Sequence, residues 1–316
     1  TGRNTYKGGL YNESGGEREV VSVAFSRYFN DGDGSFTIGY TNQNIDELSG
    51  MASTTANSSY GKYAASDYNN RTAQRSIYET EHRLFATMSS THYFLGADKP
   101  TTFNLYFERK SGLPGTYSWD TYTSRNYGGT AYQREAFGYE KNLNDDSSHL
   151  IYVPTGLTDP NVCWGSCAGA PDLAIANQVL DMLYNQLGLA SYAGQIVPNG
   201  VYEYPWQTSL DLKITQILPG FRAEDEFVIS LGIENLLNLI DSDNGEIKYG
   251  PFNGKMAVLD MYMNDDFSKY IYPNYKGRGY PDWAFGFNQN NPKGIRKSAV
   301  NSIWRAQLGF TYKFSF

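Results

Sequence analysis

The chain has 316 residues, a net charge of −7 and a mean hydropathy of −0.52. No run approaches the roughly 18 consecutive apolar residues that a membrane helix needs, which excludes a helical membrane protein. The 26 Lys and Arg residues are scattered and form no basic stripe, so we expect no nucleic-acid partner.

Six segments alternate apolar and polar residues with the period of two that is typical of β-strands. The first two flank the sequence NDGDG at residues 30–34, whose Asp and Gly residues suit the positive backbone angles of a tight hairpin turn. In chain order, the apolar positions of the six segments are Val21, Val23, Phe25; Phe36, Ile38, Tyr40; Leu84, Ala86, Met88; Phe103, Leu105, Phe107; Leu210, Leu212, Ile214; and Phe227, Ile229, Leu231, Ile233.

The last thirteen residues, 304–316, repeat this alternation most regularly. Their apolar positions are Trp304, Ala306, Leu308, Phe310, Tyr312, Phe314 and Phe316. Such an aromatic edge strand would template aggregation in a soluble protein. In a transmembrane barrel, one strand face meets lipid and the other meets the lumen, and about 9 to 11 tilted residues span the hydrocarbon layer. We therefore predict an all-β, antiparallel transmembrane β-barrel whose lipid-facing residues include Leu210, Leu212, Ile214, Phe227, Ile229, Leu231, Trp304 and Leu308.

The connections alternate in length, which indicates the orientation of the predicted barrel. Short connections lie near residues 30–34, 96–100 and 219–225, whereas long ones cover 45–78, 110–203 and 239–302. Bacterial outer-membrane barrels have short periplasmic turns and long extracellular loops, so we assign the three long connections to the cell exterior. The loop 110–203 also predicts one helix, with Leu173, Ala176, Leu180, Leu183 and Leu187 on its apolar face.

Seven strands do not make a complete bacterial barrel, because single-chain outer-membrane barrels have an even strand count. An open sheet also leaves two unpaired edges in lipid, where each unsatisfied backbone group costs several kcal/mol. Either the chain is the C-terminal part of a larger barrel, or one further strand lies near residues 5–11.

Four stretches carry a resemblance to a known family: SSHLIYVPTG (147–156), PWQTSLDLKITQILPGF (205–221), EFVISLGIENLLNLID (226–241) and WRAQLGFTYKFSF (304–316). Together they resemble the last part of TonB-dependent outer-membrane receptors of the Oar-like branch. The resemblance implies a 22-stranded barrel, of which residues 1–316 would be about the last seven strands. It also implies an N-terminal plug domain, absent from this sequence, and energy supplied by the TonB–ExbB–ExbD complex. In that family the barrel-assembly machinery reads the terminal aromatic residues, which here are Phe310, Tyr312, Phe314 and Phe316.

The cysteines, acidic clusters and histidines, which form disulfide, metal and catalytic sites in other proteins, give only weak signals in this sequence. Cys163 and Cys167 suit a local disulfide in an oxidising compartment, with free thiols as the alternative. Asp241 and Asp243 are weak candidates for a calcium site, as are the oxygen ligands in residues 142–146, but turn formation explains both patches equally well. The three histidines fall in no catalytic motif. We therefore expect no enzyme activity and no cofactor.

The aromatic stretches TYSWDTY (116–122) and GYPDWAFGF (279–287) suit either stacking on a sugar or peptide or packing as rigid loops. No motif in the sequence identifies a transported molecule. As function we expect ligand capture by extracellular loops and energised uptake across the bacterial outer membrane, with membrane lipids and the rest of the barrel as partners. The alternatives are a complete barrel of about eight strands acting as an adhesin or anchor, and a soluble, Tyr-rich β-sandwich lectin.

Overall fold

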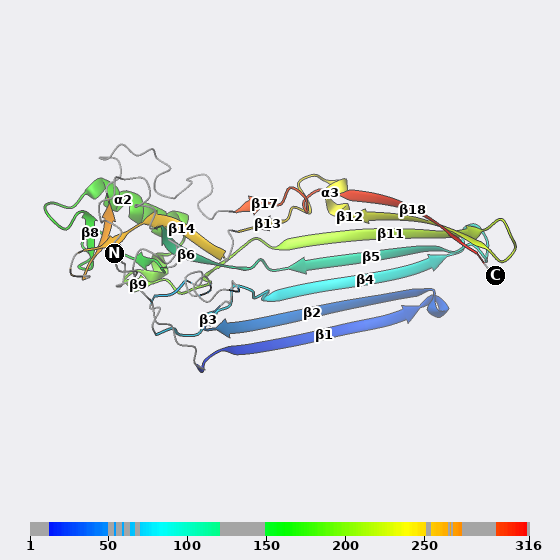
Figure 1. Ribbon diagram of the computed structural model, residues 1–316, viewed down its shortest axis with the longest axis horizontal. Coiled ribbons are helices and arrows are strands. Elements are labelled where there is room, and N and C mark those ends of the chain that lie inside the picture. The colour runs from blue at the N-terminus through cyan, green and yellow to red at the C-terminus, as the bar shows by residue number, and fades with distance from the viewer. Residues whose placement is uncertain are drawn as a thin grey trace, which may run out of the picture.

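The computed structural model describes residues 13–49, 54, 59, 64–66, 70–120, 149–250, 254–264, 266, 268–273 and 295–314. These residues form a long, slightly curved sheet with a compact group of small elements at one end (Figure 1). The predominance of strands in antiparallel sheets confirms the coarse prediction of an antiparallel β protein. Among the described residues, the structure contains no helix of the length and apolarity that a membrane span requires.

Seven long antiparallel strands make up the sheet, and each corresponds to one predicted segment. The sheet order is β1–β2–β4–β5–β11–β12–β18, with the short strand β3 (Gln74–Arg75) added to β2. The long strands are β1 (Glu17–Phe29), β2 (Gly34–Glu47), β4 (His82–His92), β5 (Thr101–Lys110), β11 (Gln207–Pro219), β12 (Glu226–Glu234) and β18 (Arg305–Lys313). Strands β1 and β18 form the two edges, so the described residues do not close the sheet into a barrel.

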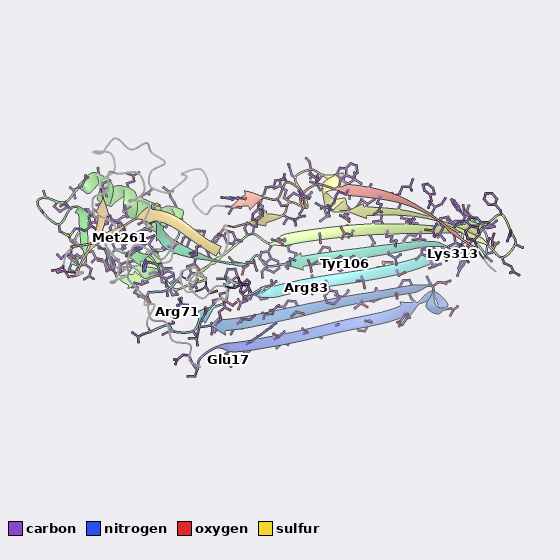
Figure 2. All side chains as sticks on the ribbon, in the orientation of Figure 1. Glu17, Arg71, Arg83, Tyr106, Met261 and Lys313 are labelled. Atoms are coloured by element: carbon purple, nitrogen blue, oxygen red, sulfur yellow. A yellow bond between two sulfur atoms is a disulfide. The ribbon has the colours of Figure 1, made fainter. Side chains whose placement is uncertain are left out.

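Short turns connect the strands at the end of the sheet that holds Lys313 (Figure 2). Strands β1 and β2 meet at the 3-10 turn Asn30–Gly32, where Asn30, Asp31 and Gly32 have φ angles of 53°, 50° and 103°. These left-handed angles suit Asn, Asp and Gly, because their side chains are short or absent. The turn predicted from NDGDG is therefore confirmed. The Tyr93 hydroxyl donates to the Asp33 carboxylate at 3.0 Å and joins this turn to the next one.

The long connections leave from the opposite end and run from 48 to 81, 111 to 206 and 235 to 304. The second contains β6 (Pro114–Asp120), β7 (Tyr152–Val153), β8 (Val162–Gly165), α2 (Leu173–Asp181), a π-helical turn (Met182–Gln186), a 3-10 turn (Ala190–Tyr192), β9 (Gln195–Ile196) and β10 (Tyr202–Glu203). The third contains α3 (Leu236–Ile240), β13 (Lys248–Tyr249), β14 (Lys255–Asp260), β15 (Tyr262–Met263), β16 (Tyr270–Pro273) and β17 (Arg296–Lys297).

Two of these long connections fold together around the hydrophobic core. Strand β14 pairs in parallel with β6, and β16 pairs in parallel with β8. Trp119, Ile151, Leu183 and Val258 are completely buried between them. We call this unit, formed by the described residues of 111–206 and 254–273, the loop module. The long strands contribute no residue to its buried cluster, so the core of the described chain lies in the connections and not on the sheet.

Helix α2 begins where the sequence predicts it, and most of its predicted apolar face is buried. The Asp172 side chain caps it by accepting from the backbone N–H groups of Ala174 and Ile175. Of the predicted face, Ala176, Leu183 and Leu187 are buried and Leu180 packs against the core, whereas Leu173 is 56% exposed. Ile175, Val179 and Met182 are buried as well, so the buried stripe is wider than predicted, and the π-helical turn then carries Leu187 to the core.

Candidate functional site

The sheet has two chemically distinct faces, and the strand register fixes which residues share each one. Leu105 on β5 lies opposite both Met88 on β4 and Leu212 on β11, and Leu212 lies opposite Ile233 on β12. The same register runs outward to Phe25 on β1 and to Leu308 on β18. Every predicted apolar position that lies within the seven described strands therefore falls on one face, which we call the apolar face.

This register brings together the residues that the sequence predicts to face lipid. Leu210, Leu212, Ile214, Phe227, Ile229, Leu231 and Leu308 all lie on the apolar face. Trp304 comes just before β18 and is 46% exposed. Val21, Val23 and Phe25 are 60–68% exposed although they are large apolar side chains. An apolar face this extensive, with no described element packed over it, is unusual for a water-soluble sheet.

Aromatic side chains gather at both ends of the apolar face. Near the long connections, the His82 ring stacks on Tyr40 and on Trp206 at centroid distances of 6.1 and 5.8 Å. Near the short turns, the ring contacts are Phe25–Phe36, His92–Phe94, Phe227–Phe310 and Tyr312–Phe314. Mostly aliphatic residues fill the band between them. This is the distribution that two membrane–water interfaces select in barrel strands.

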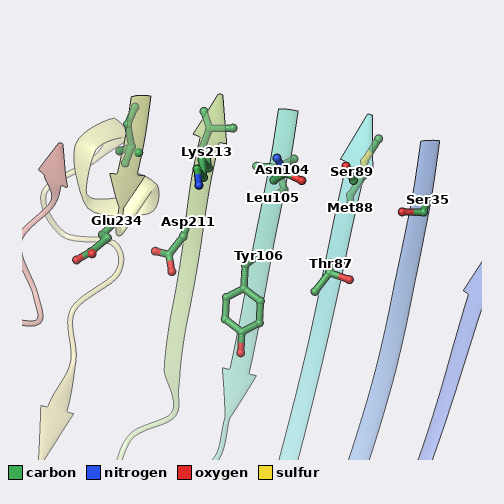
Figure 3. Close-up of a pocket in the computed structure, with 13 residues that line it drawn as sticks. Ser35, Thr87, Met88, Ser89, Asn104, Leu105, Tyr106, Asp211, Lys213 and Glu234 are labelled. Atoms are coloured by element: carbon green, nitrogen blue, oxygen red, sulfur yellow. The ribbon is translucent and has the colours of Figure 1, made fainter. Parts of the chain in front are cut away.

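The opposite face is polar and lines a hollow of about 500 Å³. Figure 3 shows side chains from neighbouring strands gathered there: Ser35 on β2, Thr87 and Ser89 on β4, Asn104 and Tyr106 on β5, Asp211 and Lys213 on β11, and Glu234 on β12. No single amino acid dominates this lining. Its polar side chains carry hydroxyl, amide, cationic and anionic groups, which suits a hydrated surface. Met88, Leu105, Leu212 and Ile233, which belong to the apolar positions, also border the hollow.

Ion pairs cross the polar face between neighbouring strands. The Glu108 carboxylate accepts from Arg83 at 2.7 Å and lies 3.1 Å from the Lys110 ammonium. Arg305 on β18 pairs with Glu234 on β12 at 2.6 Å. The Asp211 carboxylate accepts the backbone N–H of Asn235 at 2.8 Å, where the chain leaves β12 in a left-handed conformation. The charges of this face thus largely neutralise one another across adjacent strands.

In the loop module, Asp159 is the centre of a hydrogen-bond network. Its carboxylate is buried and accepts from the Tyr152 hydroxyl at 3.0 Å, the Thr155 backbone at 2.7 Å and the Asn161 backbone at 2.8 Å. Burial alone would raise the pKa of Asp159, but these hydrogen bonds lower it below its ordinary value. The adjacent Trp164 donates its indole N–H to the Leu157 carbonyl at 2.9 Å. The hydrogen bonds of Asp159 therefore hold together the segment that connects β7 to β8.

His149 is a partly buried histidine of the loop module. Its backbone bridges to Ala65 of the first long connection and accepts from the Trp119 N–H at 3.1 Å. Burial, assisted by the charge of Lys255, lowers the pKa of His149 to about 4.

The folded loop module thus disfavours the protonated imidazole, so this contribution to stability is complete above pH 6.5 and is lost as the pH falls toward 4. We expect the loss to reach about 3 kcal/mol. Urea unfolding of the loop module at several pH values measures it. A His149→Gln variant should lose the slope between pH 6.5 and 4, and an unchanged slope would contradict the assignment.

A charged cluster around Arg75 joins the first and second long connections to the rim of the sheet. The Arg75 guanidinium donates to Glu79 at 2.6 Å and Glu81 at 2.8 Å, and lies 3.6 Å from Glu203. Glu79 is only 2% exposed, and its second oxygen accepts the Ile45 N–H of β2 at 2.6 Å. Arg75 also donates to the Gly200 carbonyl at 3.3 Å. One guanidinium thus connects β2, the first connection and the loop module.

Replacing Arg75 by Gln should loosen this junction by about 2 kcal/mol, because the buried Glu79 carboxylate would lose its cation. Arg75→Lys keeps the charge without the planar fork, so we expect an intermediate loss. Limited proteolysis at increasing urea concentration measures the opening of the junction. Equal resistance of Arg75→Gln and the unchanged protein would show that Glu79 is held without Arg75.

The structure also locates the predicted terminal aromatic residues, the two cysteines and the calcium candidates. Phe310 and Tyr312 lie on the apolar face of β18, Phe314 follows it and contacts Tyr312, and Phe316 lies outside the described residues. A disulfide joins Cys163 on β8 to Cys167. The Asp241 carboxylate accepts from the Asp243 backbone at 3.0 Å and from the Asn244 amide at 2.9 Å, as a turn requires. In the part of the chain that the structure describes, no group of three potential ligands gathers around a metal position.

Both aromatic stretches fall partly or wholly outside the described residues. Tyr117 and Trp119 are buried in the loop module, which supports the packing interpretation for that part of 116–122. Residues 121–122, 142–146 and 279–287 are not among those described. The sequence analysis missed Asp159 and Arg75. The Asp-Pro-Asn sequence at 159–161 is a turn signal that indicates the first, whereas no local pattern indicates the second.

Comparisons of the chain with protein-family models, curated proteins and solved structures gave no match.

Proposed function

We propose that this chain is the C-terminal part of the barrel of a TonB-dependent outer-membrane receptor, which captures a ligand with extracellular loops and takes it up with energy from the inner membrane. The observation that carries the proposal is the continuous apolar face of seven strands, bordered by aromatic residues at both ends and not covered by any described element. The resemblance of the four sequence stretches to the Oar-like branch supplies the transport function.

The dimensions of the apolar face support a membrane environment. Strand β4 has eleven residues, which at about 3.4 Å per residue and a tilt of about 45° give a height of about 26 Å. The apolar band of outer-membrane barrels is about 25 Å tall. The aromatic pairs at the two ends of the face then lie where the hydrocarbon layer meets water.

The polar face and the open edges support a larger barrel rather than a complete small one. In this proposal, the hollow bordered by Asp211, Lys213 and Tyr106 is part of the lumen wall. The edge strands β1 and β18 do not pair with each other in the described sheet, so their outer backbone groups need further strands in lipid. The rest of the barrel and the plug are partners supplied from outside this chain.

The orientation follows from the connections. The short turns and the residues after β18 lie at the periplasmic side, and the loop module lies outside the cell. The terminal aromatic residues Phe310, Tyr312, Phe314 and Phe316 serve the barrel-assembly machinery. Ligand binding at the loop module precedes TonB-driven displacement of the plug.

The test uses the native protein in its own cells. We expect it to fractionate with the outer membrane, to migrate on gels in a heat-dependent manner and to cross-link to TonB. A heat-modifiable outer-membrane protein that never cross-links to TonB would favour the adhesin or anchor function. A protein that stays monodisperse in buffer without detergent would overturn the membrane assignment altogether.

A further inference from the structure

Within the described strands, the Lys and Arg side chains of the apolar face lie near its two ends. On the seven described long strands, Arg27 and Arg109 are the only Lys or Arg residues of this face, while Arg83, Lys213 and Arg305 lie on the polar face. Arg27 is near the short turns, and Arg109 is the second-last residue of β5, next to the long connections. A cation in the middle of a lipid face costs about 2–4 kcal/mol, but almost nothing at the interface.

Arg109 is held at the end of a row of rings. Its guanidinium carbon lies 5.4 Å from the centre of the Trp206 ring, a cation–π distance. The His82 ring stacks on Trp206 with an interplanar angle of 17°, and the Tyr40 hydroxyl lies 2.8 Å from His82 Nδ1. We call Tyr40, His82, Trp206 and Arg109 the rim row. Its members come from three strands and the residue before β11, so the sheet itself sets their spacing.

The charge of Arg109 is exposed and not neutralised within the described part of the chain. Arg75, Arg83 and Arg305 each form an ion pair with a carboxylate, whereas no described carboxylate lies within ion-pair distance of Arg109. The guanidinium fork matches the oxygens of a phosphate, and stacking on Trp206 orients it before binding. Leu84 lies directly opposite both Tyr40 and Arg109, and the aliphatic band continues from there to Leu210, which gives acyl chains an apolar surface beside the rim row.

We infer that the rim row binds the phosphate of a phosphorylated glycolipid in the outer leaflet. Arg109 contacts the phosphate, while Trp206 and Tyr40 lie against the sugar and the upper acyl carbons. This inference rests on the proposed membrane orientation, because only then does the rim row lie at the outer interface. The ligand is a lipid and not free phosphate, since the cation borders an apolar surface.

Native mass spectrometry of the delipidated native protein tests the inference, with diphosphoryl lipid A and its phosphate-free analogue as probes. We expect Arg109→Gln to bind diphosphoryl lipid A about fivefold more weakly and to bind the phosphate-free analogue as the unchanged protein does. Arg109→Lys should fall between them. The matched control is Arg27→Gln, the same substitution at the other end of the same face, which should bind normally.

The inference is overturned if Arg109→Gln binds diphosphoryl lipid A normally, if Arg27→Gln loses as much affinity, or if inorganic phosphate displaces the lipid. In each of these cases a heat-modifiable, detergent-requiring protein would leave the proposed function intact. Failure of the proposed function has a different signature, because the protein would then be soluble without detergent and would bind none of the lipid probes.

Discussion

Replacement of Leu212 by arginine is expected to block assembly of the protein into the outer membrane. Leu212 lies in the middle of β11 on the apolar face, between Leu105 of β5 and Ile233 of β12. If this face contacts hydrocarbon, the new cation costs about 2–4 kcal/mol at the membrane midplane. The level of heat-modifiable protein in the outer-membrane fraction measures the effect, with urea unfolding in lipid vesicles as the quantitative counterpart.

The matched control is Thr215→Arg on the same strand. Thr215 lies on the polar face between Thr102 and Ser230, so an arginine there meets the lumen and should change the free energy of unfolding by less than about 1 kcal/mol. The loss of assembly in Leu212→Arg distinguishes a lipid environment from a water environment at the apolar face. If the apolar face met water, an exposed arginine would be tolerated as well as the leucine. Equal assembly of the two variants would therefore contradict the lipid assignment.

The seven strands could be predicted because their residues obey a local rule. A strand with different environments on its two faces must alternate side-chain polarity, and this requirement is visible in segments such as Phe103–Phe107 and Phe227–Ile233. The turn residues Asn30, Asp31 and Gly32 added the pairing of the first hairpin. A slip by one residue would exchange the two faces, so the alternation also limits the strand pairing. A slip by two residues would keep the faces, so the exact register could not be predicted from the alternation.

Apart from helix α2, the loop module could not be predicted, because its strands are short and their partners are distant in sequence. Strand β6 pairs with β14 and β8 pairs with β16, each across more than a hundred residues of chain. Several of its strands have only two residues, such as β7 and β9, which is too short for any periodicity to be visible. Parallel pairing between separate connections leaves no turn signal either. In the Arg75 cluster, Glu79 and Glu81 belong to the same connection as Arg75, whereas Glu203 comes from the second connection and no local pattern indicates its contact.

Replacement of Trp119 by alanine is expected to unfold the loop module and to leave the long sheet assembled. Trp119 on β6 is completely buried, and its ring meets Tyr270 of β16 edge-on at a centroid distance of 5.5 Å. Removing a buried tryptophan typically costs about 3–5 kcal/mol. Because this ring joins elements of the second and third connections, its loss weakens the contact that makes them one unit.

The long sheet should survive the Trp119→Ala substitution, because it shares no residue with the core of the loop module. No residue of the long strands belongs to the buried cluster around Trp119, so β11, β12 and β18 keep all of their cross-strand pairs. We expect protease treatment of intact cells to cut the Trp119→Ala variant between residues 111 and 206 at concentrations that spare the unchanged protein, while heat-dependent migration persists. Trp304→Ala, at an exposed ring outside the module, should not increase cleavage. Loss of heat-dependent migration together with the loop module would show instead that the strands depend on this core for their assembly.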